Sequence, residues 1–351
     1  MKSIAENIEN VNLETTRGTG EILQDFSTTG KERPWKIHKQ ENLRLVELYK
    51  MSKERNLISD SRLHDLEHCA DTLVFLQNAE GKKKLKSANF CRLRLCPMCQ
   101  WRRSLKMFGQ VKKITDKILE SDKSIRFIFG TFTIKNCDAQ DLETCINILN
   151  NRFLYLVSKN RNFAPAKKLK QNLLGYLKAV EVTYNSKDKT YHPHLHVIFA
   201  VRNTFFSSSK YYMSKKEWIS LWQQALGVDY KPQTDIRAIK SGTAKAVAEV
   251  AKYPVKTAPI LKLDDDEAVE VLKTLTLSLN KKRFVSYGGI FKTIKQELKL
   301  QDVETDKDLI NVDMEQQERF NAVTAVLFRY NFKIDCEALR ASWSIFLFRL
   351  F

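Results

Sequence analysis

The most informative part of the chain is a strand-like stretch, Tyr191-His-Pro-His-Leu-His-Val-Ile-Phe-Ala-Val201. Residues i, i+2 and i+4 of a β-strand point to one face, so the side chains of His192, His194 and His196 share a face. Neutral imidazole is a common metal ligand, and three of the chain's six histidines lie here. The alternative is a set of hydrogen-bonded strand histidines, but their density favours a metal site.

A strand predicted over 177–184 precedes this one and joins it through turn residues at 185–189. Glu181 is an ionisable residue in an otherwise apolar part of that strand. Whether it faces the histidines depends on the strand register, which the sequence does not give. A set of two histidines and a carboxylate with open positions suits Mg²⁺ or Mn²⁺ acting on phosphate.

The rest of the chain alternates between further strand and helix patterns. Strands are predicted over 125–134 and 234–239, with a hairpin over 71–88. Helical spacing is found within 41–69 and over 102–119, 141–156, 215–226 and 243–253. Strands that are interleaved with helices and joined by at least one hairpin predict an α+β fold with an antiparallel sheet.

The charge of the chain indicates its partner. The 351 residues of the chain include 59 Lys+Arg and 41 Asp+Glu, which give a formal net charge of +18. Residues 82–106 and 144–180 contain no acidic residue, and such basic segments suit a nucleic acid. The basic side chains expected to contact this nucleic acid are Arg92, Arg94, Arg102, Arg103 and Lys252. No apolar run is long enough to span a bilayer and no signal peptide is evident, so we expect a soluble cytoplasmic protein without a membrane partner.

Four of the seven cysteines have the spacing of a zinc site. Cys69, Cys91, Cys96 and Cys99 follow the pattern C-x₂₁-C-x₄-C-x₂-C, and four thiolates can enclose one structural Zn²⁺. His64 and His68 are alternative ligands if Cys69 is not the fourth. The remaining cysteines, at 137, 145 and 336, are expected to be ordinary buried thiols.

A third group of residues surrounds a tyrosine. Glu249 and Tyr253 are i, i+4 neighbours if the predicted helix holds, and Lys256 follows. A nearby cation favours the phenolate of a tyrosine, and a carboxylate can accept a proton. The alternative is packing plus a surface ion pair, and Pro254 ends or kinks the helix.

In this order, the motifs resemble the rolling-circle replication initiators of small bacterial plasmids, which belong to the HUH endonucleases. The resemblance covers roughly residues 34–298, and four features carry it. These are Phe129-Gly-Thr-Phe-Thr-Ile-Lys-Asn136, His192-Pro-His-Leu-His196, Glu249 with Tyr253 and Lys256, and Phe90-Cys-Arg-Leu-Arg-Leu-Cys-Pro-Met-Cys99 followed by Trp101-Arg-Arg103.

The resemblance implies a mechanism and a fold. His194 and His196 would hold a divalent metal at the scissile phosphate, with Glu181 as the candidate third ligand. Tyr253 would attack the phosphorus, forming a 5′-phosphotyrosyl link and freeing a 3′-OH primer. Glu249 would direct a water that ends the cycle, and Lys256 would orient the phosphate. The implied fold is a five-stranded antiparallel sheet flanked by helices.

The resemblance also implies partners: plasmid origin DNA, a second copy in a homodimer, and a host helicase and polymerase. The expected segments are a flexible lead (1–33), a helical, zinc-binding and DNA-contacting region (34–105), a nicking-closing domain (106–260) and a mostly helical C-terminal region (261–351). Two alternatives stay open. One is a related HUH relaxase or single-strand transposase, and the other is a zinc-dependent nucleic-acid-binding protein without catalysis.

Overall fold

The chain divides into two compact units in a computed structural model. The structure describes residues 23–27, 30–52, 57–158, 164–207, 209–239, 247, 255, 257–305, 308–312, 324–330 and 343–349. The small unit combines residues 1–36, 70–89 and 315–351, and the large unit combines residues 37–69 and 90–314. The four consecutive segments expected from the sequence remain a prediction.

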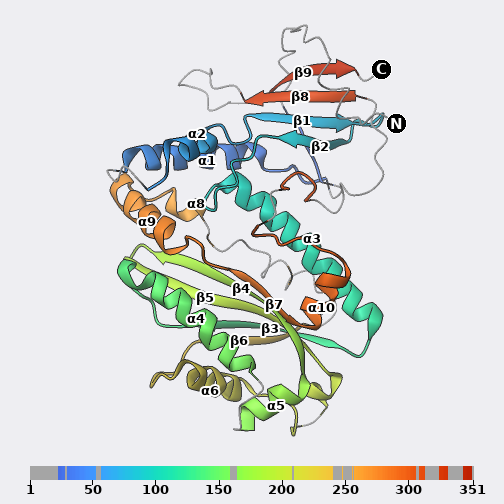
Figure 1. Cartoon of the computed structure of the whole chain (residues 1–351), viewed down its shortest axis with the longest axis vertical. Helices are drawn as coiled ribbons and strands as arrows, with labels where there is room; N and C mark the ends of the chain where they lie inside the picture. Colours follow the sequence, from blue (N-terminus) through green and yellow to red (C-terminus); the bar gives the residue numbers. More distant parts are fainter. Residues whose placement is uncertain are drawn as a thin grey trace. The chain divides into compact units, whose positions relative to one another are not determined.

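The large unit is built on a five-stranded sheet with the strand order β6-β3-β5-β4-β7 (Figure 1). Every neighbouring pair of strands in it is antiparallel. The α+β class and the five-stranded antiparallel sheet are therefore confirmed. The strands are β3 (Arg126–Thr133), β4 (Leu173–Asn185), β5 (Thr190–Val201), β6 (Thr234–Ile239) and β7 (Val285–Gly289).

Helices flank this sheet, and their ends follow local sequence signals. The helix α6 begins with a capping box between Ser214 and Glu217 and ends at Gly227, which has a left-handed φ of 71°. Apart from residue 247, the predicted helix over 243–253 lies outside the described residues. The helices are α1 (Trp35–Met51), α2 (Asp60–Glu67), α3 (Pro97–Ser121), α4 (Leu142–Val157), α5 (Ala164–Asn172), α6 (Lys215–Leu226), α8 (Thr257–Ile260), α9 (Asp265–Ser278) and α10 (Ile290–Glu297).

The two faces of the five-stranded sheet pack against different helices. On one face, Phe199 of β5 packs on Phe153 of α4, and Phe132 of β3 packs on Trp222 of α6. On the other face, Phe127 of β3 packs on Phe291 of α10. Residues that alternate along a strand lie on opposite faces, so the even-numbered residues of β5 share the face that carries α10.

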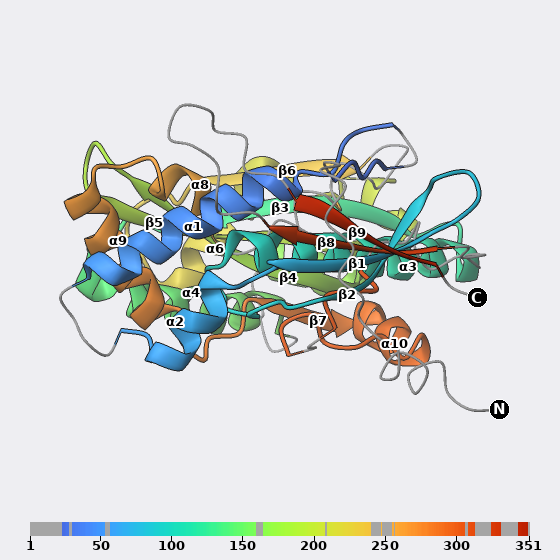
Figure 2. The ribbon, with the colours of Figure 1, turned by 90° about the horizontal axis from the view of Figure 1, so that it is seen from above.

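The small unit contains a four-stranded antiparallel sheet with the order β2-β1-β8-β9. Its strands are β1 (Thr72–Gln77), β2 (Lys83–Ala88), β8 (Thr324–Tyr330) and β9 (Trp343–Arg349). Phe75 of β1 and Phe328 of β8 are fully buried and meet edge to face, with ring centroids 5.7 Å apart. In Figure 2, β1 and β8 run alongside each other as the register requires. The hairpin predicted over 71–88 is confirmed by β1 and β2.

The C-terminal region, expected to be mostly helical, contains strands as well as helices among its described residues. Besides α9 and α10, it supplies β7 to the five-stranded sheet and β8 and β9 to the four-stranded sheet. The run Thr324-Ala-Val-Leu-Phe-Arg-Tyr330 combines β-branched and aromatic residues and has alternating burial in its second half, which is strand behaviour. In the described parts of the chain, no helix has the length and apolarity that crossing a membrane requires.

Candidate functional site

Three side chains converge on the α10 face of the five-stranded sheet. The register places Glu181 of β4 directly opposite His194 of β5, which answers the question that the sequence left open. Glu181 Oε2 lies 2.8 Å from His196 Nε2 and 3.3 Å from His194 Nε2. The two Nε2 atoms are 3.1 Å apart, and all three residues are buried. We call Glu181, His194 and His196 the triad.

The hydrogen bonding of His194 makes the triad a good fit for a cation. His194 Nδ1 lies 3.2 Å from the main-chain carbonyl of His192, and a carbonyl can only accept a hydrogen bond. In the neutral ring Nδ1 therefore carries the proton, and Nε2 presents a lone pair to the Glu181 carboxylate. Two such atoms repel at 3.3 Å unless a proton or a metal ion lies between them. The triad thus has the donor atoms and the burial of a divalent metal site.

Strand β3, which lies on the other side of β5 from β4, supports His196. Thr131 Oγ1 is in hydrogen-bond contact with His196 Nδ1 at 3.2 Å, and the ring of Phe129 stacks on the imidazole. These contacts fix the ring so that Nε2 faces Glu181. Thr131 and Phe129 belong to the first motif of the resemblance, but sequence reasoning assigned them no role. The pairing of Thr131 with His196 was the missing signal, because it depends on the β3–β5 register.

His192, also a predicted metal ligand, lies beside this group rather than in it. Its ring centroid is 5.2 Å from that of His194, and its Nδ1 contacts Asn136 Oδ1 at 2.7 Å. Asn136 in turn donates to Thr190 Oγ1. Among the described residues, the group of carboxylate and imidazole ligands consists of Glu181, His194 and His196.

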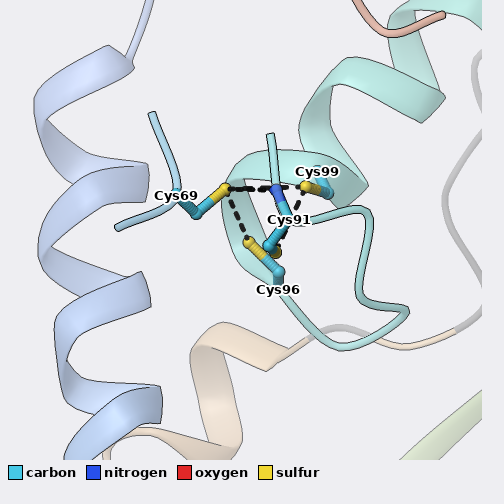
Figure 3. A group of neighbouring side chains, drawn as sticks. All are labelled: Cys69, Cys91, Cys96 and Cys99. Carbon is cyan, nitrogen blue, oxygen red and sulfur yellow. Dashed lines mark hydrogen bonds between the residues drawn. The ribbon is translucent and has the colours of Figure 1, made fainter. Parts of the chain in front are cut away.

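The four predicted zinc ligands form a second cluster, which lies in the large unit (Figure 3). Cys69 follows α2, Cys91 follows β2, and Cys96 and Cys99 belong to the N-terminus of α3. Their sulfurs are 3.6 to 3.7 Å apart where they touch, too far for a disulfide. A tetrahedron with Zn–S distances of about 2.3 Å has edges of about 3.8 Å, so the spacing fits a zinc ion. Neither His64 nor His68 joins the cluster.

The surroundings of the cysteines favour bound thiolates. The main-chain amides of Arg92 and Leu93 donate to Cys99 Sγ and Cys91 Sγ at 3.2 and 3.4 Å. Burial raises the pKa of Cys69 and of Cys91, so buried thiolates without a cation would be costly. A metal ion offsets that cost, and the positive end of the α3 dipole adds to this stabilisation.

The predicted catalytic residues around the tyrosine, Glu249, Tyr253 and Lys256, lie outside the described residues, as does Lys252. The structure does describe Val255, which forms a parallel bridge with Val182. Val182 directly follows Glu181 in β4. The chain two residues after Tyr253 therefore runs beside the strand that carries a triad ligand.

The predicted DNA-contacting arginines differ in their surroundings. Arg92 is exposed, whereas Arg94 donates to the carbonyl of Lys282. Arg102 and Arg103 are buried in α3. Their guanidinium groups donate to main-chain carbonyls, those of Leu309 and Ile310 for Arg102 and those of Arg92 and Leu93 for Arg103. We therefore leave Arg102 and Arg103 out of the DNA surface proposed below.

Comparisons with known proteins identify the family. A family model described as a replication protein matches residues 82–336. A "Protein rep" from Lactiplantibacillus plantarum is 37% identical over 322 residues, covering 89% of this chain and 97% of the relative. A "Protein rep" from Streptococcus pneumoniae is 37% identical over 310 residues, covering 87% and 92%. No solved structure matches the chain.

The chain belongs to this replication protein family. The resemblance to plasmid replication initiators, which the sequence motifs indicated, is thereby confirmed.

Proposed function

We propose that this replication initiator cuts one strand of plasmid origin DNA through a covalent tyrosine intermediate, as an HUH endonuclease. The observation that carries the proposal is the convergence of Glu181, His194 and His196 on one sheet face in a chain of the replication protein family. The bridge between Val182 and Val255 supports it, because Tyr253 precedes Val255 by only two residues.

In the proposed reaction, the Tyr253 oxygen attacks the scissile phosphorus and the bond from phosphorus to the 3′-oxygen breaks. The phenolic proton leaves to solvent or a nearby base, and the 3′-oxygen takes up a proton. The products are a 5′-phosphotyrosyl link and a 3′-OH that primes a host polymerase, while a host helicase separates the strands. Lys256 neutralises charge on the phosphate.

Mg²⁺ or Mn²⁺ bound by Glu181, His194 and His196 would polarise the scissile phosphate as a Lewis acid. The chain's own contribution is to fix the ligand atoms. His194 is held through its Nδ1 bond to a main-chain carbonyl, and His196 through Thr131 and Phe129. The burial of all three ligands limits competition from water.

The test uses single-stranded oligonucleotides that tile the origin of the plasmid encoding the chain. With Mg²⁺ or Mn²⁺ we expect cleavage and a protein–DNA adduct on a denaturing gel, and EDTA should abolish both. Tyr253→Phe should lose the adduct, while Tyr212→Phe, at a tyrosine 48% exposed and remote from the proposed chemistry, should keep it. Unchanged cutting by Tyr253→Phe would overturn the assignment of the nucleophile.

Glu249 is proposed to activate the water that ends the cycle. Glu249→Ala should therefore still nick and form the adduct but release it slowly. Removal of a general base typically costs about 10²–10⁴ in rate. Termination on a template with two origins measures the effect, and normal termination by Glu249→Ala would assign the water to another residue.

We also propose that Cys69, Cys91, Cys96 and Cys99 hold one structural zinc. Metal analysis of protein purified without chelator should find about one Zn per chain. Cys96→Ser/Cys99→Ser should lose it and unfold at a lower temperature. Cys145→Ser, at a partly buried thiol outside the cluster, should keep the zinc. Zinc retained by the double variant would place the site elsewhere.

A further inference from the structure

A basic pocket lies between β7 and α10 in the large unit. Its volume is about 380 Å³, and Figure 2 shows β7 leading directly into the helix. Four of the side chains that line it are basic and none is acidic: Arg283, Lys292, Lys295 and Lys299. Lys292 and Lys295 are i, i+3 neighbours on α10, and Lys299 lies two residues after the last residue of the helix, Glu297. We call this the β7–α10 pocket.

The positive charge of the pocket is only partly balanced by the protein. Arg283 forms an ion pair with Asp302 at 2.5 Å. The carboxylate of Glu304 accepts hydrogen bonds from the main-chain amides of Phe284 and Val285. Within the described ranges, the three lysines of the pocket have no ion-pair partner. Their charge is therefore available to an anion that enters from solvent.

Two details show that the pocket is more than a charged surface. Lys295 is half-buried, and its Nζ lies 4.6 Å from the ring centroid of Tyr287. Burial lowers the pKa of Lys295, which means that the environment penalises this cation. The Tyr287 hydroxyl is buried without a hydrogen-bond partner in the described structure. An anionic oxygen would serve both groups, accepting a hydrogen bond from the hydroxyl and stabilising the ammonium.

The pocket faces the same side of the sheet as the triad. Tyr287 is paired with Leu177 across β7 and β4, and Glu181 is paired with His194 across β4 and β5. Directly paired residues share a face, and so do alternate residues of β4 such as Leu177 and Glu181. Four residues along a strand span about 13 Å. A chain of phosphates that meets the triad therefore has further phosphates within reach of Tyr287.

We propose that the β7–α10 pocket binds a backbone phosphate of the DNA strand, away from the phosphate that is cut. The ligand chemistry is a phosphate oxyanion, which a free phosphate ion shares, and the position on the same sheet face as the triad favours DNA. Tyr287 donates one hydrogen bond, and Lys292, Lys295 and Lys299 supply charge. This proposal rests on the function proposed above for its choice of strand, but its test does not require cutting.

The experiment measures the binding of a fluorescent single-stranded oligonucleotide to the full chain by anisotropy, in EDTA and at several salt concentrations. The variants are Lys292→Gln/Lys299→Gln, which changes exposed side chains, and Tyr287→Phe, which keeps the ring. The matched control is Lys215→Gln/Lys216→Gln, which removes the same charge from exposed positions of α6 on the opposite face. Thermal unfolding confirms that the variants fold.

We expect the double pocket variant to bind several-fold more weakly than the control. For single strands, the slope of log K against log salt should become shallower by about 0.7 for each phosphate that the protein no longer neutralises. Tyr287→Phe should weaken binding with little change in slope, because it removes a donor and no charge. Equal affinity and slope for the pocket and control variants would overturn the proposal.

A second arm separates the two sources of phosphate. Inorganic phosphate at constant ionic strength should compete with the oligonucleotide for the wild type and less for the pocket variant. If phosphate binds wild type but the pocket variant keeps full DNA affinity, the pocket is a free-phosphate site and the DNA proposal is wrong. A failure of nicking by the wild type would contradict the proposed function alone, since binding is measured without metal.

Discussion

At the scale of single residues, the two triad histidines differ in the partner of their second ring nitrogen. His194 is held by a main-chain carbonyl, which no substitution removes, whereas His196 depends on the Thr131 hydroxyl. Thr131→Val should weaken Mn²⁺ binding by about 10–100-fold, the usual effect of removing an outer hydrogen bond to a metal ligand. Thr131→Ser keeps the hydroxyl and should bind as the wild type. Calorimetric titration with Mn²⁺ measures both, and equal affinities for Val and Ser would show that Thr131 does not orient the ring.

The same residues show what the sequence could reveal about the site. The sequence alone predicts that His194 and His196 share a face, because alternate residues of a strand do so whichever strands lie beside it. The sequence alone does not predict that Glu181 and Thr131 lie at this site. Glu181 depends on the register between β4 and β5, and Thr131 on the register between β3 and β5. The burial of Arg102 could not be predicted from the sequence either, because the carbonyls that accept its hydrogen bonds are more than 200 positions away in the chain.

At the scale of elements, the limit of prediction is clearest at β7. The strands β3, β4 and β5 contain runs of β-branched and aromatic residues, so local composition indicates them. In contrast, β7 reads Val285-Ser-Tyr-Gly-Gly289, and glycine is a poor strand former. Its glycines serve a contact between distant segments, because a Cβ at Gly289 would lie 2.2 Å from the carbonyl oxygen of Leu174. Such a close approach is visible only once the sheet is assembled.

The strand β4 also carries a buried cation on the face opposite the triad. Lys178 is 2% exposed, and its Nζ donates to Asn150 Oδ1 at 2.5 Å near the ring of Phe153. Burial lowers the pKa of Lys178 to about 8, against an ordinary value of about 10.4. Between these values the unfolded chain binds more protons than the folded chain, so this residue's contribution to the free energy of unfolding rises with pH.

Lys178→Met should remove that pH dependence. The difference in unfolding free energy, wild type minus variant, should increase by about 3 kcal/mol between pH 7 and pH 11, which is the pKa difference expressed as energy. Urea unfolding over this range provides the measurement. Taking the difference cancels the tyrosines, which titrate in the same range. A difference that stays flat would show that Lys178 keeps its ordinary pKa in the folded protein.

At the scale of the whole molecule, each unit has its own aromatic core. The large unit buries Phe132, Phe199 and Trp222 against its sheet, and the small unit buries Phe75 against Phe328. The small unit joins segments from both ends of the chain, and among the described residues its β1–β2 hairpin gains its third strand from β8. A two-stranded hairpin alone is at best marginally stable in water. The stability of the small unit therefore depends on the packing that β8 contributes.

Phe328→Ala tests whether the two units unfold separately. The side chain is fully buried, so its truncation should destabilise the four-stranded sheet by about 3–5 kcal/mol. Amide hydrogen exchange should accelerate in β1 and β8 while β3, β4 and β5 keep their protection, and Mn²⁺ affinity should be unchanged. Phe26→Ala, at a residue of the small unit that is 52% exposed, is the matched control and should change little. Faster exchange in β3–β5 to the same extent as in β1 would mean that both cores belong to one cooperative unit, and the triad would then depend on the small unit for its order.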